Sequence, residues 1–274
     1  MGVRKQRIAF IYDFDGTLAP GNMQEYDFIP KLKLTTKKFW GEVKRRAKDQ
    51  QADEILAYMY LMLRKAREND VTVTKRDFKQ YAKDIQLFDG VPSWFTRVND
   101  YARGKGLIPQ HYIISSGIRE MLEGTSIAKE FEAIYASSFM YDPHGVAEAA
   151  GLAVNYTTKT QFLFRINKGV KDISDNKKIN QFVEEEEREV PFTNMVFVGD
   201  GATDVPCMRL IKAKGGHSIA VYKPKTSKEL AEQLREEERV NYIAPADYSK
   251  GKRMEKIALT IIDKVAADWA AKKA

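Results

Sequence analysis

Two aspartates, Asp13 and Asp15, stand one residue apart directly after an apolar run. Side chains at this spacing point to the same side of an extended chain, so the two carboxylates lie close together. Like charges at short distance repel each other and raise each other's pKa. A protein accommodates them when a positive group, most often a metal ion, lies between them. This stretch therefore predicts a cation site.

Two further turns carry oxygen-bearing side chains after apolar runs. Asp200 and Asp204 follow residues 195–198, and Ser115-Ser116-Gly117 follows residues 110–114. If these runs are strands of one parallel sheet, the turns meet outside the same edge of that sheet. Carboxylates gathered there suit Mg²⁺, which completes its shell with water and with the phosphate of a substrate. The glycines would let backbone N–H groups approach that phosphate.

The elements that must position these turns are strands alternating with helices. Such alternation predicts an α/β fold, a Rossmann-like parallel sheet with helices on both faces that makes three layers. The expected strands are 8–12, 110–114, 133–137, 195–198, 218–221 and 242–244, with a hairpin within 139–156. The expected helices are 91–104, 118–122, 160–166, 178–188, 205–212, 228–239 and 254–269.

Residues 23–81 interrupt this alternation with helical periodicity and no strand signal. Phe39, Val43 and Ala47 stand four apart, which places them on one helix face, and Thr74 can cap a further helix. We expect residues 21–85 to form an α-helical cap domain inserted after the first strand. Residues 1–20 and 86–274 would then form the α/β core domain.

Composition and charge are those of an ordinary globular protein. The chain has 274 residues and a formal net charge of +7, with its lysines spread among acidic residues as on a solvated surface. This pattern predicts no nucleic-acid partner. The single cysteine, Cys207, fits a reducing compartment, and no apolar run reaches the roughly 18 residues of a membrane span. We expect a cytoplasmic protein without a membrane partner, either a monomer or a homodimer.

Three of these turns resemble the signatures of one family. Asp13-Phe14-Asp15-Gly16-Thr17-Leu18 resembles the first motif of the haloacid dehalogenase (HAD) superfamily of phosphohydrolases. Ile114-Ser115-Ser116-Gly117 resembles the second motif, and Val198-Gly199-Asp200-Gly201-Ala202-Thr203-Asp204 resembles the fourth. The motifs occur in the family's order and bracket most of the chain. The helical insert resembles the C1-type cap of the phosphoserine-phosphatase-like branch.

This resemblance implies a phosphatase that acts on a small phosphorylated metabolite through a covalent aspartyl-phosphate. Asp13 would be the nucleophile, and Asp15 the general acid and then the general base. Ser115 would hydrogen-bond the transferring phosphoryl group. Mg²⁺ would be held by Asp13, by the backbone carbonyl of Asp15 and by Asp200. Asp204 would orient these ligands or contact the ion through water. The residues expected to bind phosphate are Phe14, Gly16, Ser116 and Gly117.

The family's third motif is a lysine, for which this chain offers several candidates. Lys159 begins the helix expected after the hairpin, which is the usual context of that lysine. Lys177 and Lys178 lie at another expected helix start, closer to the fourth motif. Lys168 belongs to an Asn-Lys-Gly sequence that is typical of a helix end. We take Lys159 as the catalytic candidate and keep the other three open.

The insert must recognise the leaving group of the substrate. Asn22, Gln24 and Glu25 follow the first motif and can contact a polar or amino-bearing substrate. Phosphoserine phosphatases carry an acidic residue soon after that motif, and Asn22 in its place argues against phosphoserine itself. The aromatic residues of the insert are expected to be cap core, with one or two lining the pocket: Tyr26, Phe28, Phe39, Trp40, Tyr58 and Tyr60.

Other functions remain compatible with the same residues. A phosphotransferase would pass the phosphoryl group from Asp13 to an alcohol instead of water. A signalling module phosphorylated on aspartate also clusters acids around Mg²⁺, but it needs neither Asp15 nor a large helical insert. A binding protein that kept the fold is a third alternative. We expect no catalytic role for Cys207 or for the three histidines, His111, His144 and His217.

Overall fold

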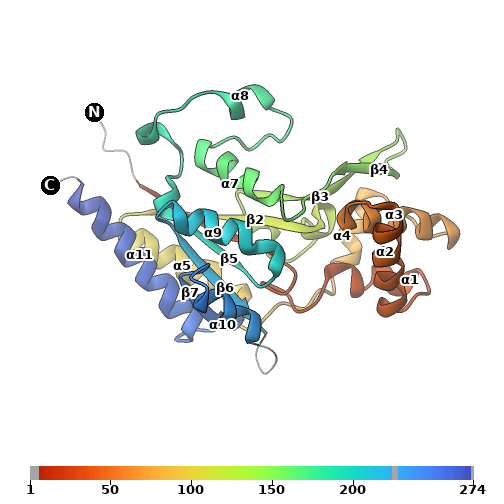
Figure 1. Cartoon of the computed structure of the whole chain (residues 1–274), viewed down its shortest axis with the longest axis horizontal. Helices are drawn as coiled ribbons and strands as arrows, with labels where there is room; N and C mark the ends of the chain where they lie inside the picture. The colour runs from red at the N-terminus through yellow and green to blue at the C-terminus, as the bar shows by residue number, and fades with distance from the viewer. Residues whose placement is uncertain (1–5, 224–227, 273–274) are drawn as a thin grey trace.

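A seven-stranded sheet forms the centre of the molecule, in the order β4-β3-β2-β1-β5-β6-β7 (Figure 1). The computed structural model describes residues 6–223 and 228–272; the remaining residues, which all belong to the predicted core domain, lie outside the described part. Neighbouring strands run parallel, except that β3 and β4 form the predicted antiparallel hairpin. The strands are β1 (Arg7–Tyr12), β2 (Ile108–Ile118), β3 (Ala133–Tyr141), β4 (Ala147–Leu152), β5 (Met195–Gly199), β6 (His217–Tyr222) and β7 (Tyr242–Pro245).

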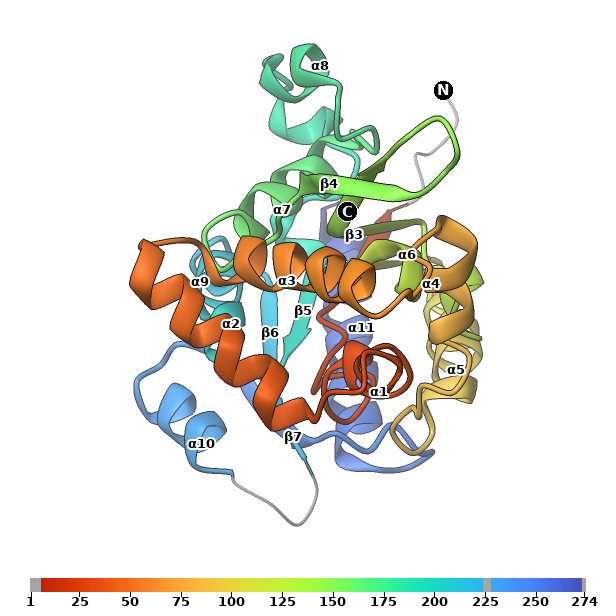
Figure 2. The ribbon, with the colours of Figure 1, turned by 90° about the vertical axis from the view of Figure 1, so that its right-hand side faces the viewer.

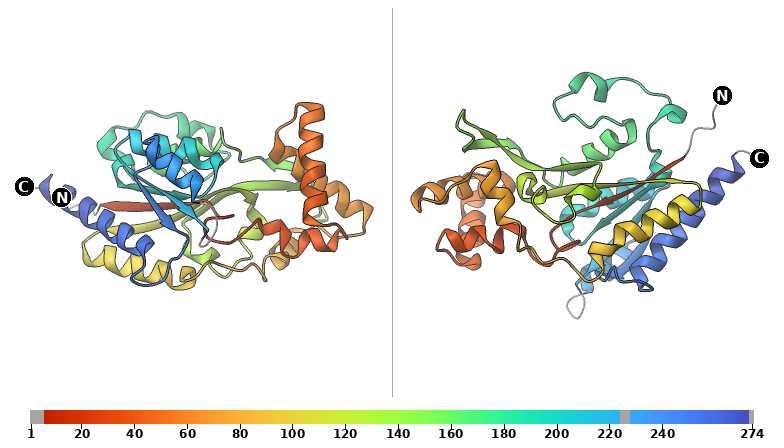
Figure 3. Two further views of the ribbon diagram at one scale, coloured as in Figure 1. Left: turned by 60° about the horizontal axis from the view of Figure 1, so that its bottom comes forward. Right: turned by 180° about the vertical axis from the view of Figure 1, so that it is seen from behind.

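Helices cover both faces of the sheet because its central strands are apolar on both sides. Phe10 and Tyr12 of β1 point to one face, and Ala9 and Ile11 point to the other. The first face packs against α5 (Val91–Gly104) and α11 (Arg253–Ala271), and the second against α7 (Lys159–Lys168), α9 (Val205–Ala213) and α10 (Glu229–Glu236) (Figure 3). These three layers confirm the predicted Rossmann-like α/β fold.

None of the helices in the described part of the chain combines the length and the apolar character that a bilayer crossing requires.

The core also contains two short helices and several 3₁₀ turns. They are α6 (Arg119–Leu122), α8 (Asn176–Asn180), and the 3₁₀ turns η2 (Ala128–Glu130), η3 (Glu185–Glu187), η4 (Phe192–Asn194) and η5 (Ala202–Asp204).

A helical insert lies beyond the carboxyl ends of the strands, as Figures 1 and 2 show. It contains η1 (Met23–Glu25), α1 (Phe28–Lys31), α2 (Thr36–Gln50), α3 (Glu54–Glu68) and α4 (Lys75–Tyr81). Side-chain caps start the three longer helices: Thr35 accepts from Lys38 N, Asp53 from Leu56 N, and Thr74 forms a capping box with Asp77. The insert is helical over the range that the sequence predicts.

Strand β2 is longer than predicted and contains the Ser115-Ser116-Gly117 turn. The pairing of β2 with β3 passes from Ser115 opposite Ala136 to Ile118 opposite Ser137, so Ser116 and Gly117 form a bulge. A bulge redirects the side chains and backbone groups of the strand that contains it. The polar residues at this strand end therefore stay within the sheet and face the site.

The helix predicted over residues 178–188 is wrong. The structure has only the short α8 there, followed by extended backbone at Gln181 and the turn η3. Lys168 Nζ donates to the carbonyl oxygens of Ile179 and Gln181, at 2.8 and 2.7 Å, which satisfies carbonyls at the end of α8. On a helix, Glu184 would face Glu187 and Glu185 would face Glu189, and these like charges disfavour its continuation.

Candidate active site

Three loops meet where β1, β2 and β5 end. Strand β1 pairs with β2 on one side and with β5 on the other, so the residues that follow these strands are neighbours. They open onto a cavity of about 380 Å³ between the sheet and the insert. Eight of the candidate catalytic, metal-binding, phosphate-binding and substrate-contact residues line this cavity: Asp13, Asp15, Asn22, Gln24, Ser115, Ser116, Gly117 and Asp200.

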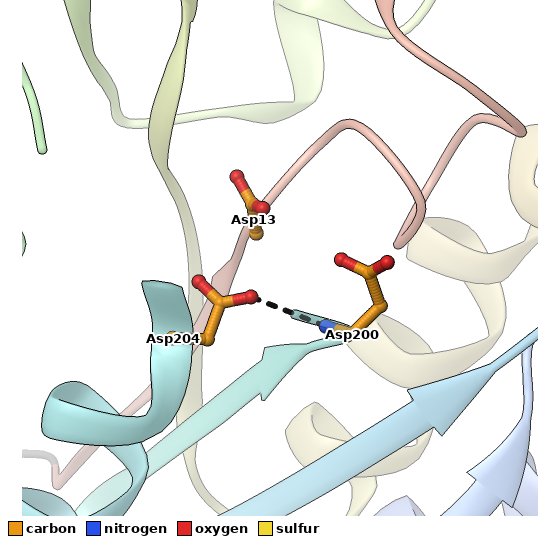
Figure 4. A group of neighbouring side chains, drawn as sticks. All are labelled: Asp13, Asp200 and Asp204. Atoms are coloured by element: carbon orange, nitrogen blue, oxygen red, sulfur yellow. Dashed lines mark hydrogen bonds between the residues drawn. The ribbon is translucent and has the colours of Figure 1, made fainter. Parts of the chain in front are cut away.

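Three carboxylates form a compact cluster on the core side of this cavity. One oxygen from each of Asp13, Asp200 and Asp204 lies within 4.8 Å of the others, and Figure 4 shows the three side chains together. Asp204 is held in place because its Oδ2 accepts from the backbone N–H groups of Asp200 and Gly201, at 3.2 and 3.1 Å. Asp15 is not part of this cluster of side chains.

Burial and mutual repulsion make this cluster electrostatically unfavourable for the protein alone. Burial raises the pKa of Asp13 to about 6; Lys159 opposes that rise, and Asp204 adds to it. Burial, together with the charges of Asp13 and Asp204, raises the pKa of Asp200 to about 8. A hard divalent cation would offset this repulsion, and it prefers oxygen ligands such as these carboxylates.

Gly16 creates the space that Asp200 occupies. Its φ is +76°, and a Cβ at this position would lie 2.0 Å from Asp200 Oδ2. The Gly16 N–H donates to Ala19 O at 2.8 Å, within the turn. The structure therefore gives Gly16 a spacing role, and its contact with phosphate stays a prediction.

Lys159 is the only one of the four candidate lysines that reaches the carboxylates. It is the first residue of α7, it is fully buried, and its Nζ lies 3.2 Å from Asp13 Oδ1 and 2.7 Å from Asp204 Oδ1. Burial lowers its pKa, but the charges of Asp13 and Asp204 outweigh burial, so the net pKa is raised and the side chain stays an ammonium. Lys177 and Lys178 are exposed on α8.

Asp15 is oriented by the start of the insert. Its Oδ1 accepts from the backbone N–H of Met23 at 2.9 Å, and burial, with the charge of Asp13 as a second cause, raises its pKa well above the usual value. Met23 is fully buried against the β2 bulge, where a Cβ on Gly117 would lie 2.1 Å from Met23 Cε. The absence of a side chain at Gly117 thus allows the insert to pack onto the site.

The β2 bulge supplies hydroxyl groups to the cavity. Ser115 is buried, and its Oγ accepts from Gly117 N at 3.1 Å, so its hydroxyl can still donate its own hydrogen. The Oγ of Ser116 is also buried and has no hydrogen-bond partner among the described residues. Phe14, in contrast, is a fully buried core side chain. Only its backbone is available for the predicted phosphate contact.

Glu25 supports the cavity wall without lining it. Its Oε1 accepts from Asn22 Nδ2 at 2.6 Å and from Trp40 Nε1 at 2.7 Å. Asn22 and Trp40 line the cavity, whereas Glu25 is not among the lining residues of the described chain. The structure therefore places Glu25 behind these two residues, and a direct contact of Glu25 with the substrate stays a prediction.

Two of the aromatic residues of the insert line the cavity, Trp40 and Tyr58, as the sequence predicts for one or two of them. Six further residues line the cavity that the sequence did not indicate. They come from the start of α3 (Asp53, Glu54 and Ile55), from the loop after β4 (Asn155 and Tyr156) and from η5 (Thr203). Asp53 and Asn155 are typical capping and turn residues, so their types alone did not indicate a site.

A family model described as haloacid dehalogenase-like hydrolase matches residues 10–209, which is more than half of the chain. The chain belongs to this family. The matched range spans all three motifs and the whole helical insert. In this HAD hydrolase, the cluster of carboxylates and Lys159 lies at the ends of the strands that carry the family's motifs.

Comparison with other proteins agrees with this assignment. An uncharacterized protein of Borreliella burgdorferi is 28% identical over 295 residues, covering 95% of this chain and 100% of the relative. The structure of a substrate-bound phosphoserine phosphatase superposes with a TM-score of 0.55 at 15% identity, covering 88% of this chain and 93% of that one. A phosphoserine phosphatase with a phospho-aspartyl intermediate analogue gives a TM-score of 0.53 at 14% identity, covering 92% and 98%. These likenesses establish a shared fold.

Proposed function

We propose that this HAD hydrolase is a phosphatase that hydrolyses a small phosphate monoester through a covalent intermediate on Asp13. The observation that carries the proposal is the convergence of Asp13, Asp200, Asp204 and Lys159 at one point, with Asp15 adjacent. A buried nucleophile next to an ammonium and two more acids is suited to phosphoryl transfer, which depends on positioning and charge neutralisation. The phospho-aspartyl analogue in a protein of the same fold supports this chemistry.

The carboxylate cluster fits Mg²⁺. Its oxygens lie within 4.8 Å of one another, and Asp13 Oδ1 is buried without a hydrogen-bond donor, although it lies 3.2 Å from Lys159 Nζ. We propose that Asp13, the backbone carbonyl of Asp15 and Asp200 hold the ion, with Asp204 behind them. When bound, the ion supplies positive charge that offsets the carboxylates and the phosphate of the substrate.

In the first step, a carboxylate oxygen of Asp13 forms a bond to phosphorus as the ester P–O bond breaks. Asp15, whose raised pKa favours the protonated form, gives its proton to the leaving oxygen. Ser115 donates its hydroxyl hydrogen to a phosphoryl oxygen. Lys159 stays charged and stabilises the negative charge that builds up beside Asp13. The products of this step are an alcohol and an aspartyl-phosphate.

In the second step, a water molecule attacks the phosphorus of the aspartyl-phosphate. Asp15, now deprotonated, removes a proton from that water, and the bond between phosphorus and the Asp13 oxygen breaks. Inorganic phosphate leaves, and the carboxylate of Asp13 is regenerated with Asp15 protonated again. The two steps together consume one ester and one water.

We further propose that residues 21–85 act as a cap domain over a core made of residues 1–20 and 86–274. Asp53 of the insert accepts from Asn155 Nδ2 of the core at 2.8 Å, so the two parts are joined directly at the cavity. A cavity of about 380 Å³ suits a small phosphorylated metabolite. Closure of the insert over such a substrate would exclude bulk water from the intermediate.

Release of phosphate from an aryl phosphate and from a panel of phosphorylated metabolites tests this proposal. We expect Mg²⁺-dependent release that EDTA abolishes and added Mg²⁺ restores. Asp13→Asn should remove activity while circular dichroism shows an unchanged fold, because the amide is nearly isosteric with the carboxylate. Full activity in Asp13→Asn, or in the presence of EDTA, would contradict the proposal.

A further inference from the structure

Apart from the residues at the strand ends, the cavity is lined mainly by the insert. We define the leaving-group pocket as its lining residues Gln24, Trp40, Asp53, Glu54, Tyr58 and Tyr156. All but Tyr156 belong to the helical insert, and Tyr156 lies in the loop between β4 and α7. An ester bound with its phosphate at Asp13 would place its alcohol part in this pocket.

The leaving-group pocket contains acidic residues and no basic residue. In the part of the chain that the structure describes, no lysine, arginine or histidine lines the cavity. Lys159 is nearby, but its ammonium is engaged by Asp13 and Asp204. A carboxylate on the leaving group would therefore enter the pocket without a cation to pair with, beside Asp53 and Glu54.

Gln24, which lines this pocket, has an unsatisfied acceptor. The residue is only 2% exposed, and its Oε1 is buried and accepts no hydrogen bond from any described residue. A buried polar atom without a partner is unfavourable, and native proteins seldom keep one without a reason. A hydrogen-bond donor on the substrate would supply the missing partner, so Gln24 selects for an N–H or an O–H group.

The remaining residues of the pocket favour a positive charge on that donor. Both oxygens of Asp53 are held, Oδ1 by Leu56 N at 3.0 Å and Oδ2 by Asn155 Nδ2 at 2.8 Å, which fixes its negative charge in place. Glu54 is exposed and lines the cavity. The rings of Trp40 and Tyr58 lie 5.8 Å apart, and aromatic faces attract cations.

We propose that the substrate is a phosphorylated amino alcohol whose ammonium group donates to Gln24 Oε1 between the acidic and aromatic residues of the leaving-group pocket. This inference rests on the proposed phosphatase function and narrows it to one class of ester. It excludes phosphorylated hydroxy acids as good substrates, since their carboxylate finds no partner. Quaternary ammonium esters, which have no N–H group, would leave Gln24 unsatisfied.

Three esters of the same length test the proposal. Phosphoethanolamine carries an ammonium, 2-hydroxyethyl phosphate a neutral hydroxyl, and phosphoglycolate a carboxylate. We expect kcat/KM to fall in that order, with at least about a tenfold difference between the first and the last. Equal values, or a preference for phosphoglycolate, would overturn the proposal.

Variants then locate the preference in the pocket. Gln24→Leu should lower kcat/KM for both phosphoethanolamine and 2-hydroxyethyl phosphate, and it should lower the first more, because an ionised donor makes the stronger hydrogen bond; the ratio of the two values should therefore fall several-fold. Gln86→Leu makes the same change at an exposed residue outside the cavity and should leave the ratio as it is. Glu54→Gln, at an exposed position, keeps the test available if Gln24→Leu does not fold, and it should lower the ratio as well. An unchanged ratio in the folded pocket variants would overturn the proposal.

Calorimetric titration of Asp13→Asn protein separates this inference from the proposed function. If no ester, including an aryl phosphate, releases phosphate, the phosphatase proposal fails while the binding preference can still be measured. Tighter binding of phosphoethanolamine than of phosphoglycolate in the presence of Mg²⁺ would support the pocket. Equal binding of the two esters would overturn it.

Discussion

The charge balance of the site depends on one residue, Lys159. Its ammonium is buried between Asp13 and Asp204, at 3.2 and 2.7 Å, and no other candidate lysine reaches these carboxylates. A buried charge that loses its partner is strongly destabilising. The loss of this cation would also leave the charge that develops beside Asp13 without stabilisation.

Replacement of Lys159 by methionine should therefore lower kcat by roughly 10²–10³-fold. Methionine keeps most of the side-chain length, so the loss reports on the charge. Lys177→Met, at an exposed residue of α8, is the matched control and should keep kcat within about twofold. Steady-state release of phosphate measures both variants, and a Lys159→Met enzyme as active as the control would contradict the role assigned to this lysine.

The residues that could be identified from the sequence alone are those whose spacing along the chain fixes their position. Asp13 and Asp15, at the end of one strand, are of this kind, and so is Asp200. Lys159 could be preferred from its place at an expected helix start, but three other lysines stayed open, because only the tertiary packing of α7 brings one of them to Asp13. The position of Glu25 behind Asn22 and Trp40 could not be predicted, because the sequence does not show that the indole N–H of Trp40 donates to Glu25.

The turn after β1 depends on the lack of a side chain at Gly16. Gly16 and Gly145 both have a positive φ, at +76° and +79°, but only Gly16 lies against another group, the carboxylate of Asp200. Gly145 has nothing within 4 Å of its ideal Cβ position. Alanine substitutions at Gly16 and at Gly145 therefore separate the effect of backbone strain, which both share, from the effect of displacing Asp200, which only Gly16→Ala has.

Gly16→Ala should lower the free energy of unfolding by about 1–2 kcal/mol, because alanine is strained in the left-handed backbone conformation. It should also raise the Mg²⁺ concentration needed for activity at least about tenfold, because Asp200 must move. Gly145→Ala should show the loss of stability with no change in Mg²⁺ dependence. Urea unfolding and Mg²⁺ titration of activity measure the two effects. Identical Mg²⁺ curves for both variants would contradict the spacing role of Gly16.

Elements with a continuous apolar pattern were predictable, and those without it were not. The central strands β1 and β5 bury every residue or nearly every residue, and their positions follow from short apolar runs. The end of β2 was missed because its Ser-Ser-Gly sequence has no strand pattern, although it stays paired with β3. The helix expected over 178–188 failed because hydrophobic spacing was weak there and the acidic run opposed it.

At the scale of the whole molecule, stability should depend on pH through the buried network beneath the site. His111 is 2% exposed, with Nδ1 3.1 Å from Tyr12 Oη and Nε2 2.9 Å from Asn99 Oδ1. Burial, with the charge of Arg103 as a second cause, lowers its pKa to about 3. The unfolded chain, in which histidine has its ordinary pKa near 6.5, therefore binds an additional proton between these two values.

His111 alone should consequently lower the free energy of unfolding as the pH falls from about 6.5, by at most about 1.4 kcal/mol per pH unit, whereas Asp13 and Asp200, whose pKa values are raised, act in the opposite direction. His111→Gln removes the histidine contribution, so the free energy of unfolding of this variant should increase relative to that of the wild-type protein as the pH falls over this range. His144→Gln, at an exposed position in the hairpin turn, should keep the wild-type slope. Urea unfolding between pH 7 and about pH 4.5 measures these slopes, and parallel curves for wild type and His111→Gln would contradict the assignment.

The arrangement of core and insert divides the work between two parts of the molecule. The acids and Lys159 lie on the core at the strand ends, while most of the leaving-group pocket belongs to the insert. The order of the motifs along the chain predicted this division. The contents of the pocket could not be predicted, because Asp53 and Asn155 meet across the cavity although they are 102 residues apart in sequence.

In the proposed mechanism, Asp13 carries the phosphoryl group during turnover. Rapid acid quenching of the enzyme with substrate and Mg²⁺, followed by mass spectrometry of its peptides, detects this intermediate. We expect the peptide containing Asp13 to gain one phosphoryl group that is absent without substrate and absent in Asp13→Asn. Release of phosphate with no phosphoryl group on Asp13 at any quench time, or with the group on another residue, would contradict this mechanism.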